Sequence, residues 1–186
     1  KGNGMDFSYS LNGVAFPSRI MNASGPLCTW ENELNALGES ASGALVLKST
    51  TFEARTGNER PKYYENNWGS INSNGLENPG YKKYCELIPK LKRFGKPVIS
   101  SISGFSLEEF TEMVRALDHA GADVLEVNLS CPNIAGKPQV AYDFEMSEKY
   151  LHEIRSTTEK PLWVKLPPYF EIIHRQEMAR AYKRGF

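Results

Sequence analysis

The stretch PVISSISGFSLEEFTEMVRALDHAGADVLEVNL, residues 97–129, determines which class of fold the chain adopts. It contains two short apolar runs, 97–102 and 124–129, in which β-branched residues recur. Runs of this kind are typical of strands that are buried on both faces of a parallel sheet. We therefore expect two parallel strands here, joined by the segment between them.

The joining segment has the signals of a helix. Ser106 and Glu109 have the spacing of a capping box, in which each side chain satisfies a backbone N–H group at the helix start. Apolar residues then recur at helical period, and Gly121 supplies the left-handed residue that ends many helices. The pattern predicts a helix over 107–120, which makes the whole stretch a strand–helix–strand unit.

The rest of the chain repeats this alternation. Further buried strands are expected at 19–23, 44–48 and 162–166. A second helix is expected at 147–157, with weaker candidates at 31–37, 81–94 and 176–184. Such alternation indicates an α/β protein with a parallel sheet. Ahead of it, apolar and polar residues alternate around Asn12-Gly13, which predicts a β-hairpin with a type I′ turn over residues 7–16.

Polar side chains follow all five expected strands. They are Asn22 and Ser24, Lys48 and Ser49, Ser101 and Ser103, Asn128 and Cys131, and Lys165. A doubly wound sheet binds ligands at one switch point, whereas a barrel builds its site around the carboxyl ends of its strands. The pattern therefore favours a (β/α)8 TIM barrel, which typically needs about 250 residues. We expect residues 1–186 to be a single domain with the first five βα units and the hairpin, the C-terminal units being absent.

Composition excludes several classes of function. Lys and Arg number 22, as do Asp and Glu, so the net charge of +0 provides no basic surface for nucleic acid or an anionic membrane. No apolar run approaches the length of a membrane span. The three cysteines (Cys28, Cys85 and Cys131) form no CxxC pair, and no metal-ligand spacing occurs, so we expect no metal site and a reducing, cytoplasmic setting.

The densest group of chemically active residues is in the segment 126–139. A strand delivers Asn128 to the edge of the sheet, and a loop then presents Cys131 and Asn133. Pro132 restricts the residue before it to extended geometry, which gives the thiol a defined direction. Amides bind planar polar ligands and a thiol exchanges a proton. The alternative interpretation is a loop with a half-buried cysteine that only packs.

Three further features belong with this group. Residues 67–80 are an irregular loop in which the N–H groups of Gly75 and Leu76 are candidates for ligand contact, or else a plain surface turn. Gly25 follows an expected strand and allows a flat ligand to approach the backbone. Lys48 and Lys165 at strand ends favour an anionic ligand or a reduced cofactor, unless their ammonium groups simply reach out to water.

The segment NLSCPN at 128–133, followed by GKPQVAYDF at 136–144, resembles the dihydroorotate dehydrogenases. It is most similar to their soluble, fumarate-linked class 1A. The likeness extends in collinear order over the whole chain, which resembles the N-terminal portion of such an enzyme. Supporting stretches are NASGP at 22–26, LKST at 47–50, ERP at 59–61, INS at 71–73, SISG at 101–104 and VKLPPYF at 164–170.

The resemblance implies a barrel that holds FMN and oxidises (S)-dihydroorotate to orotate in pyrimidine synthesis, with fumarate as the acceptor. It makes Cys131 the general base, and hydride passes to flavin N5. The substrate-binding residues that it implies are Lys48, Asn72, Gly75, Leu76, Asn128 and Asn133. The cofactor-binding residues that it implies are Ala23, Ser24, Gly25, Lys48, Ser49, Asn128 and Lys165.

The resemblance also implies a homodimer of the complete protein. Asn74 and Ala135 depart from the class pattern, which often has Met and Pro there, so loop closure is expected to differ. Two alternatives stay open at this point. One is another FMN barrel that acts on a pyrimidine, such as the dihydropyrimidine dehydrogenase domain. The other is a non-catalytic truncated fragment, since 186 residues provide only half of a flavin site.

Overall fold

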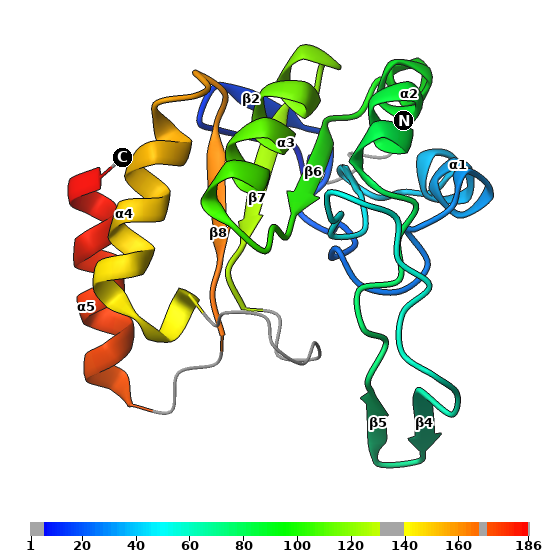
Figure 1. Ribbon diagram of the computed structural model, residues 1–186. Helices are drawn as coiled ribbons and strands as arrows, with labels where there is room; N and C mark the ends of the chain where they lie inside the picture. Colours follow the sequence, from blue (N-terminus) through cyan, green and yellow to red (C-terminus); the bar gives the residue numbers. More distant parts are fainter. Residues whose placement is uncertain (1–5, 131–139, 168–170, 186) are drawn as a thin grey trace.

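The computed structural model describes residues 6–130, 140–167 and 171–185. Its centre is a parallel sheet of four strands in the order β3 (Leu45–Val46), β6 (Val98–Ile102), β7 (Val124–Asn128) and β8 (Leu162–Lys165). The spatial order follows the chain order, and every pair is parallel. This is the arrangement of consecutive βα units in a (β/α) barrel, as the sequence predicts (Figure 1).

Helices cover one face of the sheet (Figure 1). They are α1 (Glu31–Glu39), α2 (Tyr81–Leu91) with the short 3₁₀ helix η1 (Lys92–Phe94), α3 (Leu107–His119), α4 (Phe144–Arg155), which follows the 3₁₀ helix η2 (Val140–Tyr142), and α5 (Ile172–Gly185). Successive helices pack side by side. The main core lies between them and the sheet, because alternate strand residues such as Leu125 and Val127 point toward the helices.

The opposite face of the sheet packs against the amino-terminal hairpin, β1 (Tyr9–Leu11) and β2 (Val14–Phe16). Phe16 stacks between Tyr9 and Trp163, with ring centroids 4.8 and 6.0 Å away. Asn12 and Gly13 have φ of 51° and 78°, which confirms the predicted turn with two left-handed residues. The hairpin therefore closes the amino-terminal end of the barrel interior, and the polar residues lie at the other end.

The prediction of a strand at 19–23 is wrong. The segment runs beside β3, but its only backbone bond there among the described residues joins the Gly43 N–H to the Ile20 carbonyl, at 2.7 Å. The Asn22 side chain takes the place of further pairing, because it donates to the Val46 carbonyl at 2.7 Å and accepts from the Val46 N–H at 3.1 Å. Ile20 is 79% exposed, so the segment lacks the buried face that a ladder strand needs.

A second hairpin was not predicted. Residues 67–80 were expected to be irregular, but β4 (Tyr63–Asn66) pairs with β5 (Gly69–Asn72) in an antiparallel ladder that projects from the body of the molecule (Figure 1). Its large apolar side chains face solvent, and Trp68 is 96% exposed. Because the hairpin has no buried face, it has no alternation of apolar and polar residues by which sequence analysis recognises a strand.

Helices α1, α2 and α3 begin where the sequence predicts, whereas α4 and α5 begin three and four residues earlier than expected. In α3, Ser106 accepts from the Glu109 N–H at 3.3 Å and Glu109 accepts from the Phe105 N–H at 2.7 Å. Helix α4 begins at Phe144 rather than at 147, because Asp143 caps it by accepting from the Met146 N–H at 2.9 Å. In the parts of the chain that the structure describes, no helix is long and apolar enough to cross a membrane.

Candidate functional site

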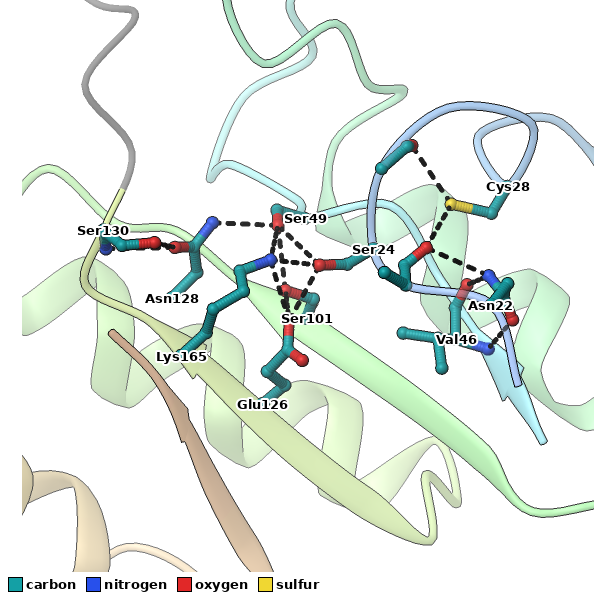
Figure 2. A network of polar contacts seen from close by, with 12 residues as sticks. Asn22, Ser24, Cys28, Val46, Ser49, Ser101, Glu126, Asn128, Ser130 and Lys165 are labelled. Carbon is teal, nitrogen blue, oxygen red and sulfur yellow. Dashed lines mark hydrogen bonds and ion pairs between the residues drawn. The ribbon is translucent and has the colours of Figure 1, made fainter. Parts of the chain in front are cut away.

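Six polar residues meet at the carboxyl ends of the parallel strands, and we call them the edge cluster. Its members are Ser24, Ser49, Ser101, Glu126, Asn128 and Lys165. They come from the loop before α1, the turn after β3, and strands β6, β7 and β8 (Figure 2). In a barrel this end of the sheet carries the active site.

An ion pair lies at the centre of the edge cluster. The Lys165 Nζ is 3.0 Å from Glu126 Oε1, and the two side chains are 34% and 15% exposed. The same ammonium donates to the Ser24 hydroxyl and, at 3.4 Å, to the Ser49 hydroxyl. The pair is therefore partly buried and hydrogen-bonded on several sides, which is the condition under which a buried charge is tolerated.

Glu126 is held as a carboxylate. Its Oε1 accepts from Ser24 at 2.8 Å and from Ser101 at 2.6 Å, in addition to Lys165. Burial by itself raises the pKa of this carboxyl, but the Lys165 ammonium and the two hydroxyls outweigh burial, so the pKa lies below its usual value of 4.5. The ionised form thus persists in an environment that would otherwise neutralise it.

The hydroxyl of Ser49 connects this ion pair to an amide. It is 2.8 Å from the Ser101 hydroxyl and accepts from the Asn128 side-chain NH₂ at 3.0 Å. Asn128 Oδ1 in turn accepts from the N–H and the hydroxyl of Ser130, both at 3.0 Å. Asn128 is only 4% exposed, so the network fixes which way its amide points.

The loop that carries Ser24 is held by hydrogen bonds from a buried thiol. Cys28 is fully buried and donates to the carbonyls of Ala23 and Gly25, at 3.5 and 3.2 Å. Burial raises the pKa of Cys28 to about 11, so the group stays a thiol. The backbone carbonyl of Cys28 accepts from the Lys48 N–H at 3.0 Å. Cys28 thus holds the predicted cofactor loop, with Ser24, against the strand end.

A second loop is organised by Asn78, which is 1% exposed. Its Oδ1 accepts from the Gly80 N–H at 2.8 Å and the Thr51 N–H at 3.2 Å, and its NH₂ donates to the Leu76 carbonyl at 2.7 Å. Gly75 and Leu76 have φ of 69° and 56° in this loop. A Cβ on Gly75 would lie 2.4 Å from Asn58 Oδ1, so this position requires glycine.

Most of the predicted residues lie in or beside the edge cluster. Ser24, Ser49, Asn128 and Lys165 belong to it, and Ala23 and Gly25 flank Ser24. A cleft of about 260 Å³ next to it is lined by Gly25, Lys48 and Asn74, together with Pro26, Leu27, Thr29, Trp30, Glu33 and Glu77. Asn72 is exposed at the end of β5. Cys131, Asn133 and Ala135 lie outside the described residues.

Sequence reasoning did not assign site roles to Glu126, Ser101 or Asn78. A signal for Glu126 exists, because an acidic residue in the middle of the apolar run VLEVN has to find a partner inside the protein. Ser101 was noted only as a polar residue at a strand end. Asn78 had no signal beyond the turn-forming pair Asn78-Pro79.

The parallel sheet and its edge cluster define a (β/α)-barrel protein with a ligand site at the carboxyl ends of its strands. Comparison with known proteins makes this class specific. The family model for dihydroorotate dehydrogenase matches residues 7–185, and the chain belongs to that family. Members of the family depend on a flavin.

Individual relatives agree. The chain is 47% identical over 163 residues to the dihydroorotate dehydrogenase (fumarate) of Trypanosoma cruzi, which covers 86% of this chain and 52% of the relative. It is 44% identical over 168 residues to dihydroorotate dehydrogenase A (fumarate) of Lactococcus lactis, covering 88% and 54%. The dihydroorotate dehydrogenase (fumarate) of Trypanosoma brucei brucei is 42% identical over 186 residues, covering 98% of this chain and 59% of the relative. The chain thus spans somewhat more than half the length of these relatives.

Proposed function

We propose that this chain is part of an enzyme that oxidises (S)-dihydroorotate to orotate in pyrimidine synthesis, with FMN as its cofactor and fumarate as the electron acceptor. Residues 1–186 would be a single domain, the N-terminal part of the flavin-binding barrel. The observation that carries the proposal is the edge cluster, where a lysine held by a buried carboxylate lies beside a fixed amide. Family membership and relatives named for the fumarate-linked enzyme support it.

The residues present fit a flavin ring. The edge cluster supplies hydroxyl, amide and ammonium donors, which match the carbonyl and nitrogen edge of such a ring. A Cβ built on Gly25 meets no described atom within 4 Å, so a flat group has space to approach that backbone. Gly25, which follows Ser24 of the cluster, also lines a cleft together with Lys48. Lys165 is the cation that would stabilise an anionic reduced ring.

The flavin, when bound, supplies the hydride acceptor for C6 of the substrate. The residues of the chain remove the proton and bind the substrate. Cys131 removes the C5 proton as general base, a role that comes from the resemblance because this residue lies outside the described part. By the same resemblance, Lys48 would contact both the cofactor and the substrate.

The remaining roles concern substrate binding. Asn72, Asn128 and Asn133 hold the pyrimidine through their amides. The N–H groups of Gly75 and Leu76 bind its carboxylate, in a loop that Asn78 keeps rigid. Fixed donors of this kind bind an anion without the cost of ordering a flexible side chain.

The test is stopped-flow reduction of bound flavin by dihydroorotate, in the protein expressed at the full length that its gene encodes. Wild type is compared with Cys131→Ser and with Cys85→Ser, a control for loss of a thiol elsewhere. We expect Cys131→Ser to slow bleaching at neutral pH by about 10²–10⁴-fold, the usual worth of a general base, and Cys85→Ser to leave it unchanged.

Other outcomes would overturn the proposal in distinguishable ways. Equal bleaching rates for wild type and Cys131→Ser would refute the assignment of the base. Bleaching by dihydrouracil rather than dihydroorotate would indicate a different pyrimidine-oxidising barrel. A colourless, aggregating protein would indicate a non-catalytic fragment. The homodimer and the cytoplasmic location are part of the same proposal, and sedimentation of the purified protein tests the dimer.

A further inference from the structure

Glu126 has contacts that the sheet does not need. Its neighbours along β7, Leu125 and Val127, pack into the main core. On the other face of the sheet, Val124 of β7 and Ile99 of β6 pack against the amino-terminal hairpin. An apolar residue at 126 would continue the strand without the cost of burying a charge. Glu126 instead receives three donors on one oxygen, from Ser24, Ser101 and Lys165, at the point where the edge cluster begins.

These three donors come from widely separated parts of the chain. In the ladder, Glu126 pairs with Ser101 of β6 and with Trp163 of β8, whereas Lys165 pairs with Asn128. The Lys165 side chain therefore reaches back along β8 toward the centre of the sheet to meet the carboxylate (Figure 2). Without this carboxylate, nothing charged in the edge cluster would draw the ammonium to that position.

Building on the proposed function, we infer that Glu126 is a positioning residue, which holds the Lys165 ammonium in place and, as its counter-ion, sets how strongly that charge favours reduced over oxidised flavin. The distance of 3.0 Å makes the two groups a direct ion pair. A neutral residue of the same shape would keep the hydrogen bonds and remove the compensating charge, leaving Lys165 with its full field.

The decisive variant is Glu126→Gln in the full-length protein loaded with FMN. The amide oxygen still accepts from Ser24 and Ser101, so the local packing is retained. Removal of the one negative charge that neutralises Lys165 would be worth about tenfold in the ratio of affinities for reduced and oxidised flavin. For a two-electron couple, about tenfold corresponds to an upward shift of about 30 mV in midpoint potential, measured by equilibration with redox dyes.

A second readout needs no flavin. Reductive methylation of surface amines, followed by peptide mass spectrometry, reports how accessible and reactive Lys165 is. We expect its labelling to increase in Glu126→Gln, because the ammonium stays beside the Ser24 and Ser49 hydroxyls but no longer has a carboxylate competing with the reagent for it. Glu126→Asp keeps the charge but withdraws it by one methylene, so both readouts should move in the same direction by less.

The matched control is Asp123→Asn. Asp123 also pairs with a lysine, Lys92, at 2.5 Å, but it stands at the amino end of β7, away from the edge cluster. If the potential or the Lys165 labelling in Glu126→Gln equals that of the control, the inference is wrong even though the protein binds FMN. If the wild-type protein binds no FMN, the proposed function fails first and the inference fails with it.

Discussion

Replacement of Gly75 by alanine tests whether the loop at 72–78 binds a ligand through its backbone. Gly75 has φ of +69°, a conformation that costs an L-residue about 1–2 kcal/mol. The added Cβ would also lie 2.4 Å from Asn58 Oδ1 and 2.7 Å from the Asn58 backbone nitrogen. Since ordinary contact begins at 3.4 Å, the loop has to move by about 1 Å.

In the proposed function, a shift of this size would take the Gly75 and Leu76 N–H groups out of reach of the substrate carboxylate. A hydrogen bond to a charged group contributes about 1.5–3 kcal/mol, so losing one should weaken orotate binding by about 10–100-fold. The assay is titration of the flavin-loaded, full-length protein with orotate, followed by the change in flavin absorbance. Thermal unfolding of the same samples reports the loss of stability.

Gly95→Ala is the control, because Gly95 has a similar φ of +65° and a Cβ there meets no described atom within 4 Å. Both variants should lose about 1–2 kcal/mol of stability through the backbone conformation, but only Gly75→Ala should lose orotate affinity. Unchanged orotate binding in Gly75→Ala, or an equal loss in Gly95→Ala, would show that this loop does not hold the carboxylate.

Two further predictions concern stability. Asn78→Ala should lower the free energy of unfolding in urea by about 2–4 kcal/mol, because it leaves buried N–H groups of Thr51 and Gly80 without their acceptor. The control Asn32→Ala, at an exposed position of α1, should change it by less than about 0.5 kcal/mol, and equal effects would contradict the role of Asn78. For Glu126, the pKa is lower in the folded protein, so its contribution to stability is present above the usual pKa of 4.5 and disappears as the pH falls through the folded value. The stability advantage of wild type over Glu126→Gln should therefore shrink on acidification below 4.5, and a constant or growing difference would refute this.

The elements that sequence analysis predicted correctly are those with a local signal. The hairpin turn rests on Asn12-Gly13 and the start of α3 on Ser106 and Glu109, and each signal lies within a few residues. The strands β6, β7 and β8 are apolar runs that need both faces covered. Parallel order then brings their carboxyl ends together, so the location of the site followed from the pattern of strands.

What could not be predicted depends on distant partners. The side-chain amide of Asn22 takes up the backbone groups of Val46 that a paired strand would otherwise bind. The two residues are 24 positions apart, and neither alone indicates this contact. Glu126 belongs to the site because it binds Ser24, and the two residues are 102 positions apart in the chain, so no local pattern links them. The projecting β4–β5 hairpin has no buried face, so its ladder bonds leave no hydrophobic pattern to detect.

The hydrogen bond between Lys165 and Ser24 joins residues that are 141 positions apart. On a ribosome that adds about 5–20 residues per second, Ser24 is made roughly 7–28 seconds before Lys165. Glu126 is made 39 residues before Lys165, so for roughly the last 2–8 seconds of that interval it has its hydroxyl partners at most and lacks its cation. The cluster is completed only when β8 docks onto β7, so the proposed cofactor would bind there late in biogenesis, after the sheet has assembled.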